Sequence, residues 1–412
     1  LMKFNRKINP HTKPKQNFIT KKRLKEDEID FDKLRSYRLD RVKKELEKNN
    51  LEACILFDPV NIRYALDTVN MSVYNMHNLT RYCFVPVNGP VILYEYFNCE
   101  KLSEHLNLID EIRPSITWDY FSNGNQASIQ LKKWINEIRD LSNSYFKSKK
   151  IAIDVLNGPA VSALNKVGIE VLDAKIILEQ ARVIKSAEEL KCMKAAIEVA
   201  EIGVSKMRDE LKAGITEDEL WSILHKTNIE HGGEWIECRI LSSGQRTNPW
   251  MQESSNKIIQ SGEMVAFDTD MVGPYGYCAD ISRTYVEGHK FNDDQKKLYK
   301  MAVEQINHNS RIIKNGTSFK EFTEKSWKLP EEYYGNRYSV MVHGIGLCDE
   351  WPAIRYPADG GQREGLFEKN MTITIESYIG KVGGKEGVKL EQQYLVGQNN
   401  LELMSHHSLE DI

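Results

Sequence analysis

The pattern of hydrophobic and polar positions changes near the middle of the chain. Between residues 31 and 184, short apolar runs typical of strands alternate with amphipathic runs typical of helices, such as the helical pattern at 128–146. This alternation predicts an α/β domain over residues 31–184. Residues 1–30 are polar and basic, contain proline and lack such periodicity, which favours an N-terminal arm.

A different order of elements fills residues 185–412. Two helical patterns, each opened by a capping-box sequence (residues 186–189 and 216–219), are followed by several strand patterns. Two more helical patterns and further strands then repeat this order. A helix–helix–strand unit that occurs twice predicts a duplicated ααβ domain, with the boundary between the two domains near residue 184.

Composition and charge narrow the class of protein. The 412 residues are 41% hydrophobic and 28% charged, with a net charge of -3, which describes a globular protein without the basic surface of nucleic-acid or membrane-surface binders. The seven scattered cysteines form no Cys-x-x-Cys pair and indicate reduced thiols. No signal-peptide pattern and no membrane-length apolar run occurs, so we expect a cytoplasmic protein. We expect His406 and His407 at the surface.

Acidic residues interrupt several strand patterns of the second domain. Asp268 and Asp270 stand two apart in one pattern, so a continuous strand would turn both carboxylates to the same face. Asp280, Glu376 and Glu391 each stand alone among apolar neighbours. Taken singly, each acid fits an exposed strand position better. Taken together, they need a partner, because an isolated buried carboxylate is costly.

One histidine stands in the stretch MVHGIGL, at His343. Five carboxylates and one imidazole suit two divalent metal ions bound side by side, with carboxylates bridging them. Oxygen-rich ligation with one nitrogen fits Mn, Fe(II), Co or Zn. The predicted ligands are Asp268, Asp270, Asp280, His343, Glu376 and Glu391.

The order of these ligands resembles the metal set of the pita-bread superfamily, which includes methionine aminopeptidase, prolidase and creatinase. Residues 267–285 resemble the first metal-binding hairpin of that superfamily, residues 342–347 resemble its His-Gly-x-Gly strand, and residues 57–68 resemble the creatinase/prolidase N-terminal domain. The resemblance implies a creatinase-like N-terminal domain followed by a C-terminal pita-bread catalytic domain.

Two positions depart from the peptidases of this superfamily. Asp349 stands where they keep a second histidine on the substrate side, and Trp250 and Met251 stand where they keep another. The proton carriers of peptide hydrolysis are therefore missing. Residues 57–81, 232–253 and 341–357 resemble the DddP-type dimethylsulfoniopropionate (DMSP) lyases, a branch of the same fold, and this resemblance includes the departures.

The resemblance implies a β-elimination that gives dimethyl sulfide and acrylate, with a metal ion binding the substrate carboxylate and Asp349 as the base. We expect burial beside Trp351 to raise the pKa of Asp349. Tyr338 is a second candidate for proton handling. A sulfonium group favours aromatic surroundings, and the candidates for substrate contact are Trp250, Trp351, Tyr64, Tyr74 and His77. The resemblance also implies iron as the metal and a homodimer.

Three alternatives remain at this point. An Xaa-Pro aminopeptidase or prolidase is supported by the full ligand set and opposed by the two missing histidines. A lyase or hydrolase of another small zwitterion, such as a betaine or a guanidino acid, would use the same metals with a changed pocket. A non-enzymatic binding module is disfavoured, because such domains usually lose ligands.

Overall fold

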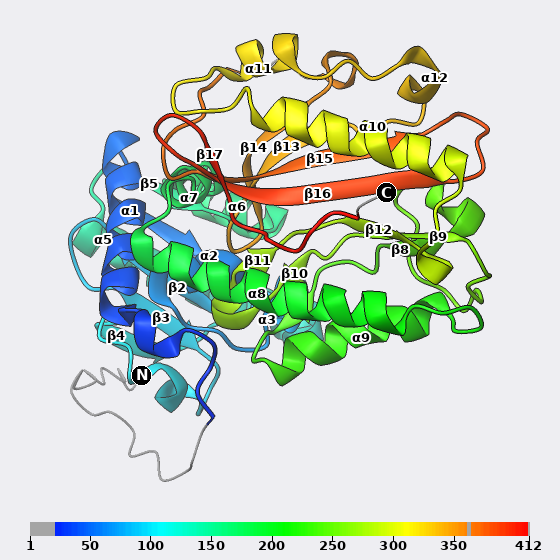
Figure 1. The fold of residues 1–412 in the computed structure, drawn as a ribbon. Coiled ribbons are helices and arrows are strands. Elements are labelled where there is room, and N and C mark those ends of the chain that lie inside the picture. The colour runs from blue at the N-terminus through cyan, green and yellow to red at the C-terminus, as the bar shows by residue number, and fades with distance from the viewer. Residues whose placement is uncertain (1–20, 361–363, 411–412) are drawn as a thin grey trace. The chain divides into compact units, whose positions relative to one another are not determined.

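The computed structural model describes residues 21–360 and 364–410 and divides into two compact units (Figure 1). Asp30–Arg182 form the first unit, while Lys21–Ile29 and the chain from Val183 onward form the second. The predicted N-terminal arm lies mostly outside the described residues, and its described end belongs to the second unit. None of the helices in the described part of the chain combines the length and apolar character needed to cross a membrane.

The first unit is built on one six-stranded mixed sheet with strand order β4-β3-β2-β1-β5-β6. β1 pairs antiparallel with β2 and parallel with β5. The strands are β1 (Ala53–Leu56), β2 (Tyr82–Pro86), β3 (Ile92–Glu95), β4 (Glu111–Pro114), β5 (Lys150–Ile153) and β6 (Glu170–Asp173). The helices are α1 (Phe31–Lys48), α2 (Pro59–Leu66), α3 (Ser72–His77), α4 (Tyr120–Asn123), α5 (Ala127–Tyr145), α6 (Gly158–Lys166) and α7 (Lys175–Arg182).

The core of this sheet follows from its strand sequences. β1 and β2 are buried at every position, as expected for strands that read as continuous apolar runs. α5 buries Trp134 and Ile138 on one face of an amphipathic helix, and Trp134 packs against Phe57 and Trp118. The α/β class expected for the first domain is confirmed.

The second unit opens with two helices, α8 (Ala187–Glu210) and α9 (Glu217–Glu230). Both begin with a complete capping box, in which Ser186 pairs with Glu189 and Thr216 with Glu219, as the sequence predicts. Short strands follow: β7 (Trp235–Ile236), β8 (Leu241–Ser243), β9 (Met264–Phe267), β10 (Met271–Val272), β11 (Cys278–Ala279) and β12 (Arg283–Val286). They form two three-stranded sheets, ordered β11-β10-β7 and β12-β9-β8.

The same order of elements then occurs again, with α10 (Asp293–Ser310), α11 (Phe319–Lys325) and a short α12 (Glu331–Tyr334) before five strands. These strands form one antiparallel sheet, β14-β13-β15-β16-β17, made of β13 (Val340–Ile345), β14 (Asp349–Arg355), β15 (Thr372–Gly380), β16 (Gly387–Val396) and β17 (Leu401–Leu403). α10 lies along β15 and β16 in Figure 1. The duplicated arrangement expected from the sequence is confirmed.

Side-chain and backbone hydrogen bonds join β16 of the large sheet to the segment around β12. Glu391 N donates to Ser282 O, and the Thr284 hydroxyl both accepts from Lys389 N and donates to Lys389 O. This junction sets the acidic residues near β12 beside those of β15 and β16.

Candidate metal centre

Three of the predicted ligands lie on the large sheet. Glu376 on β15 and Glu391 on β16 are direct cross-strand partners, so both side chains project from the same face. His343 lies on β13, which pairs with the other edge of β15 and places Thr374 opposite His343. All three side chains are buried.

The other three predicted ligands lie where short strands are interrupted, so the continuous strand expected to carry Asp268 and Asp270 is not formed. β9 ends at Phe267, immediately before Asp268, and Asp280 lies between β11 and β12. Asp270 has a left-handed backbone with φ of 34°, so Asp268 and Asp270 do not share one face of a continuous strand. The alternation rule fails here because it holds only for extended backbone.

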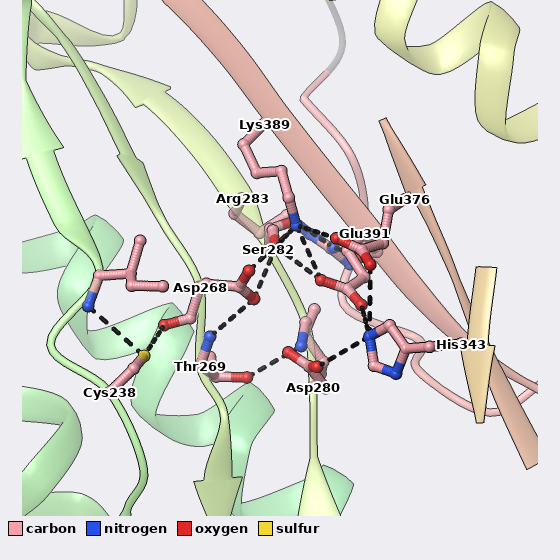
Figure 2. Close-up of polar contacts among 12 residues, drawn as sticks. Cys238, Asp268, Thr269, Asp280, Ser282, Arg283, His343, Glu376, Lys389 and Glu391 are labelled. Atoms are coloured by element: carbon pink, nitrogen blue, oxygen red, sulfur yellow. Dashed lines mark hydrogen bonds and ion pairs between the residues drawn. The ribbon is translucent and has the colours of Figure 1, made fainter. Parts of the chain in front are cut away.

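Three carboxylates point toward the ring of His343 (Figure 2). Its Nε2 lies 3.3 Å from Glu376 Oε1, 3.4 Å from Glu391 Oε1 and 3.5 Å from Asp280 Oδ2. Its Nδ1 is 3.0 Å from Gly344 O, which can only accept a hydrogen bond, so Nδ1 donates there and Nε2 is the ring nitrogen that faces the carboxylates.

These positions fit a divalent metal ion. Two ligand atoms about 2.1 Å from one ion at a tetrahedral angle lie about 3.4 Å apart. Within the described residues, Asp280 Oδ1, Glu376 Oε1 and Glu391 Oε1 are buried without a hydrogen-bond partner, which is costly unless a cation binds them. Potential ligand atoms also gather within 4.8 Å of one another in the trios His343–Glu376–Glu391 and Asp268–Asp280–Glu391.

Asp270 differs from the other five predicted ligands. It belongs to none of the close trios found among the described residues. Burial and the neighbouring Asp268 raise the pKa of Asp270 to about 7, and Cys238 lies beside it. Its role as a metal ligand stays a prediction, which its closeness to Asp268 supports.

Burial and mutual repulsion set the pKa values of the carboxylates in this cluster. Burial and the charge of Glu391 raise the pKa of Glu376 to about 8 and that of Asp280 well above its usual value. Burial alone would raise the pKa of Glu391 too, but the Lys389 ammonium and His343 bring it well below the usual range. A bound cation would replace the protons that such a cluster otherwise retains.

Asp349 lies at the edge of this cluster, at the start of β14. Its Oδ1 is 3.5 Å from His343 Nδ1, and its side chain is 64% exposed, whereas the predicted ligands His343, Glu376 and Glu391 are buried. Reduced hydration raises its pKa, His343 opposes this rise, and Glu391 and Asp268 add to it. The raised pKa agrees with the prediction; the side chain is more exposed than expected beside Trp351, but the surrounding protein still reduces its hydration.

The two predicted tryptophans lie in different apolar clusters of the second unit. Trp351 packs edge-on against Phe319, with ring centroids 5.8 Å apart. Trp250 is buried against Tyr378. Their part in binding a sulfonium group stays a prediction. Tyr338 is half-buried beside the cluster of Trp250, and the charge of Glu376 together with burial raises its pKa well above the usual value, so its hydroxyl stays protonated.

The remaining candidates for substrate contact belong to the first unit. Tyr64 is buried on α2 and donates a hydrogen bond to Ala181 O at 2.8 Å, which gives it a packing role. Tyr74 and His77 lie on α3, where Tyr74 is half-buried and His77 is exposed. Their part in substrate binding stays a prediction.

Sequence reasoning missed one charged residue in the centre, Lys389. Its side chain is fully buried, and its ammonium group contacts Asp268, Glu376 and Glu391 at 2.9–3.0 Å. The signal was present in the sequence: Lys389 stands two residues before Glu391 in an apolar strand, and residues two apart in a strand share a face.

Comparison with known proteins identifies the family. Residues 191–398 match the model of metallopeptidase family M24. The dimethylsulfoniopropionate lyase DddP of Roseovarius nubinhibens is 34% identical over 390 residues, which cover 92% of this chain and 87% of that protein. The chain belongs to metallopeptidase family M24. Within this family its likeness to the DMSP lyases spans both units, because the matched part takes in most of the chain.

Peptidases of the family are also similar to this chain. An Xaa-Pro dipeptidase of Pyrococcus horikoshii is 31% identical over 229 residues, covering 54% of this chain and 62% of that protein. The structure of an Xaa-Pro dipeptidase from Bacillus anthracis matches with a TM-score of 0.75 at 19% identity, covering 91% of this chain and 98% of that one. The expected fold, a creatinase/prolidase-like N-terminal domain with a pita-bread domain after it, is confirmed.

Proposed function

We propose that this protein is a DMSP lyase, which cleaves dimethylsulfoniopropionate into dimethyl sulfide and acrylate by a metal-assisted β-elimination. The observation that carries this proposal is the 34% identity with a DMSP lyase over 92% of the chain. The site agrees with it, since an exposed carboxylate, Asp349, lies beside the ligand cluster at a position where peptidases of this fold keep a histidine.

The reaction removes a proton from the carbon next to the substrate carboxylate. Divalent ions held by the six ligands would act as Lewis acids on that carboxylate and stabilise the negative charge that develops there. Asp349 accepts the proton. The electron pair of the broken C–H bond forms the carbon–carbon double bond, and dimethyl sulfide leaves as a neutral molecule with the electrons of the C–S bond.

Asp349 and Tyr338 differ in whether they can accept or donate a proton. The raised pKa of Asp349 brings this carboxylate closer to the pH at which a general base works best, and its exposure leaves it accessible to a substrate. Tyr338 stays protonated because of Glu376 and burial, so it can donate a hydrogen bond to the substrate but is not a base.

We also propose finer properties that rest on the likeness to the DddP-type lyases. The centre binds two divalent ions, and iron is the preferred metal, with Mn, Co or Zn as possible replacements. The protein acts as a homodimer. The scattered free cysteines and the near-balanced charge support a cytoplasmic location.

The test measures dimethyl sulfide in the headspace above purified, metal-quantified protein supplied with DMSP. We expect release of dimethyl sulfide that stops when a chelator removes the metal and resumes when the metal is returned. Lack of dimethyl sulfide from metal-loaded protein would contradict the proposal.

A parallel assay with an Xaa-Pro dipeptide addresses the second candidate function, which the similarity to Xaa-Pro dipeptidases favours. Dipeptide cleavage without dimethyl sulfide would assign the chain to the peptidases. Betaine and guanidino-acid substrates extend the assay to other small zwitterions.

A further inference from the structure

Lys389 lies on the same face of β16 as Glu391, two residues before it, and its side chain is 0% exposed. Its Nζ is 3.0 Å from Asp268 Oδ2 and 2.9 Å from both Glu376 Oε2 and Glu391 Oε2 (Figure 2). It also donates to Ser282 Oγ at 2.6 Å. A buried ammonium group is stable only when its charge is paired and its hydrogens are bonded, and these four oxygens meet both needs.

The contacts of Lys389 separate the two oxygens of each glutamate. Oε2 of Glu376 and Oε2 of Glu391 face the ammonium group, while Oε1 of each faces His343 Nε2 at 3.3 and 3.4 Å. Among the described residues, both Oε1 atoms lack a hydrogen-bond partner. The lysine therefore fixes the rotation of both carboxylates so that one oxygen of each is left for a metal ion.

Asp268 is held in a similar way. Its Oδ2 accepts from Lys389, and its Oδ1 accepts from Thr269 N at 3.1 Å and from the Ser282 hydroxyl at 2.7 Å. The Ser282 hydroxyl also lies 2.8 Å from Glu391 Oε2. Lys389 and Ser282 thus connect carboxylates that come from β15, β16 and the end of β9.

Two aromatic rings cover the ammonium group. Nζ lies 5.4 Å from the ring centroid of Trp250 and 5.5 Å from that of Tyr338, within the range of cation–π contacts. These are two of the side chains that the sequence associates with substrate binding and proton handling. In the structure they face a cation that belongs to the protein itself.

We propose that Lys389 is a positioning residue of the metal centre: its ammonium group orients the ligand carboxylates toward His343 and ties Trp250 and Tyr338 to them. This inference rests on the proposed metal site, but it does not depend on DMSP being the substrate. Replacing a side chain that orients a metal ligand without itself binding the metal commonly weakens metal affinity about 10–100-fold.

If Lys389 instead competed with the metal ion for the carboxylates, its replacement would have the opposite effect on metal affinity. If the ammonium group only filled space that a metal ion would otherwise take, its removal would relieve repulsion and strengthen metal binding. The sign of the change in metal affinity therefore decides between a positioning residue and a competing cation.

The test compares Lys389→Met with Lys389→Arg and the wild type. Metal-free proteins are titrated with Zn²⁺ against a chelating indicator, and the visible spectrum of the Co²⁺-loaded proteins reports ligand geometry. We expect Lys389→Met to bind Zn²⁺ about 10–100-fold more weakly with an altered Co²⁺ spectrum. Lys389→Arg, which keeps a charged donor, should lie closer to the wild type in both measurements.

Lys257→Met is the matched control, because Lys257 is also paired and largely buried but contacts Glu263 and Ser243 instead of the ligands. Its Zn²⁺ affinity should equal that of the wild type. An Lys389→Met affinity equal to or tighter than wild type would overturn the proposal, and so would equal losses in the Met and Arg variants. If Lys389→Met does not fold, Lys389→Gln is titrated with Zn²⁺ in its place, and the same outcomes decide the proposal. Failure of the lyase assay would leave these binding results unaffected.

Discussion

At the scale of single residues, exposure separates the groups that would hold metal from the one that would react. Asp280, His343, Glu376 and Glu391 are buried, and their free ligand atoms face one another. Asp349 is close to His343 but 64% exposed. A buried group can bind an ion throughout a reaction cycle, whereas a base has to meet the substrate and exchange its proton afterwards.

Replacing Asp349 with Asn should therefore separate chemistry from metal binding. The amide keeps the shape of the side chain but cannot accept the proton, so we expect dimethyl sulfide release to fall about 10²–10⁴-fold. Metal content, measured by elemental analysis, should stay at the wild-type level. Asp294→Asn, a change at an exposed aspartate on α10, serves as control. A variant that retained most of its lyase activity would show that another group is the base.

His343→Ala, unlike Asp349→Asn, should lower the metal content of the protein. His343 Nε2 is the nitrogen on which three carboxylates converge, so its removal takes a ligand from the middle of the cluster. We expect the purified variant to lose both bound metal and lyase activity. Elemental analysis and the headspace assay on the same sample check this. An active variant without metal would rule out the Lewis-acid role.

At the scale of elements, the turn between β13 and β14 brings His343 and Asp349 together. The pairing of these strands shifts register between His343 and Gly344, where Gly344 faces Glu350. A side chain on Gly344 would come within 2.4 Å of the backbone oxygen of Trp351, so a glycine is needed for this close approach. Glu350, buried next to Asp349, also pairs with Lys185 Nζ at 2.6 Å.

Lys185→Met should destabilise the second unit by up to about 3–5 kcal/mol, because it removes an ammonium group that pairs with the buried carboxylate of Glu350. The double variant Lys185→Met/Glu350→Gln should recover much of this loss, since no buried charge then remains. Chemical unfolding of the wild type, both single variants and the double variant checks the cycle. A loss in the double variant equal to the sum of the single losses would show that the two side chains are not coupled.

The C-terminal segment after β17 gives a pH-dependent prediction. His407 was expected at the surface, but it contacts Ser205 Oγ at 3.2 Å and Tyr285 Oη at 2.9 Å, and burial together with Arg283 and Arg208 lowers its pKa to about 4. Between pH 6.5 and 4 the unfolded chain therefore takes up a proton that the folded protein does not. This group accordingly removes stability as the pH falls through that range.

His407→Gln should thus lose less stability than the wild type between pH 7.5 and pH 4.5. Melting temperatures of both proteins at the two pH values measure the difference, and other titrating groups cancel in the comparison. His406→Gln, a change at the exposed neighbouring histidine, should follow the wild type. Equal losses for the wild type and His407→Gln would show that His407 is not held in its neutral form.

Much of this organisation could be predicted from the sequence because it depends on local signals. Capping boxes at Ser186 and Thr216 and the apolar periods of α5, α8, β15 and β16 specify elements directly. The errors lie where tertiary structure interrupts a regular pattern. The backbone turns at Asp270, and Lys389 is stable in the core only because three carboxylates from distant segments surround it.

At the scale of the whole molecule, all six predicted ligands belong to the second unit, and each unit has its own apolar core. Metal binding should therefore stabilise only part of the chain. At an ion concentration about 100 times the dissociation constant, binding contributes ~2.7 kcal/mol to a protein that binds only when folded. For a unit of this size that corresponds to a shift of roughly 5–10 °C in the melting temperature.

Differential scanning calorimetry of the metal-loaded protein should resolve two transitions, and a chelator should lower only one of them by about this amount. The chelator-sensitive transition should become insensitive in His343→Ala, which has lost the centre, and its melting temperature should lie near that of the chelated wild type. A single transition that shifts as a whole would mean that the two units unfold cooperatively, so that metal bound in the second unit also stabilises the first. Equal melting temperatures with and without metal would show that the cluster of buried acids is stable through its internal contacts, with Lys389 as its main cation.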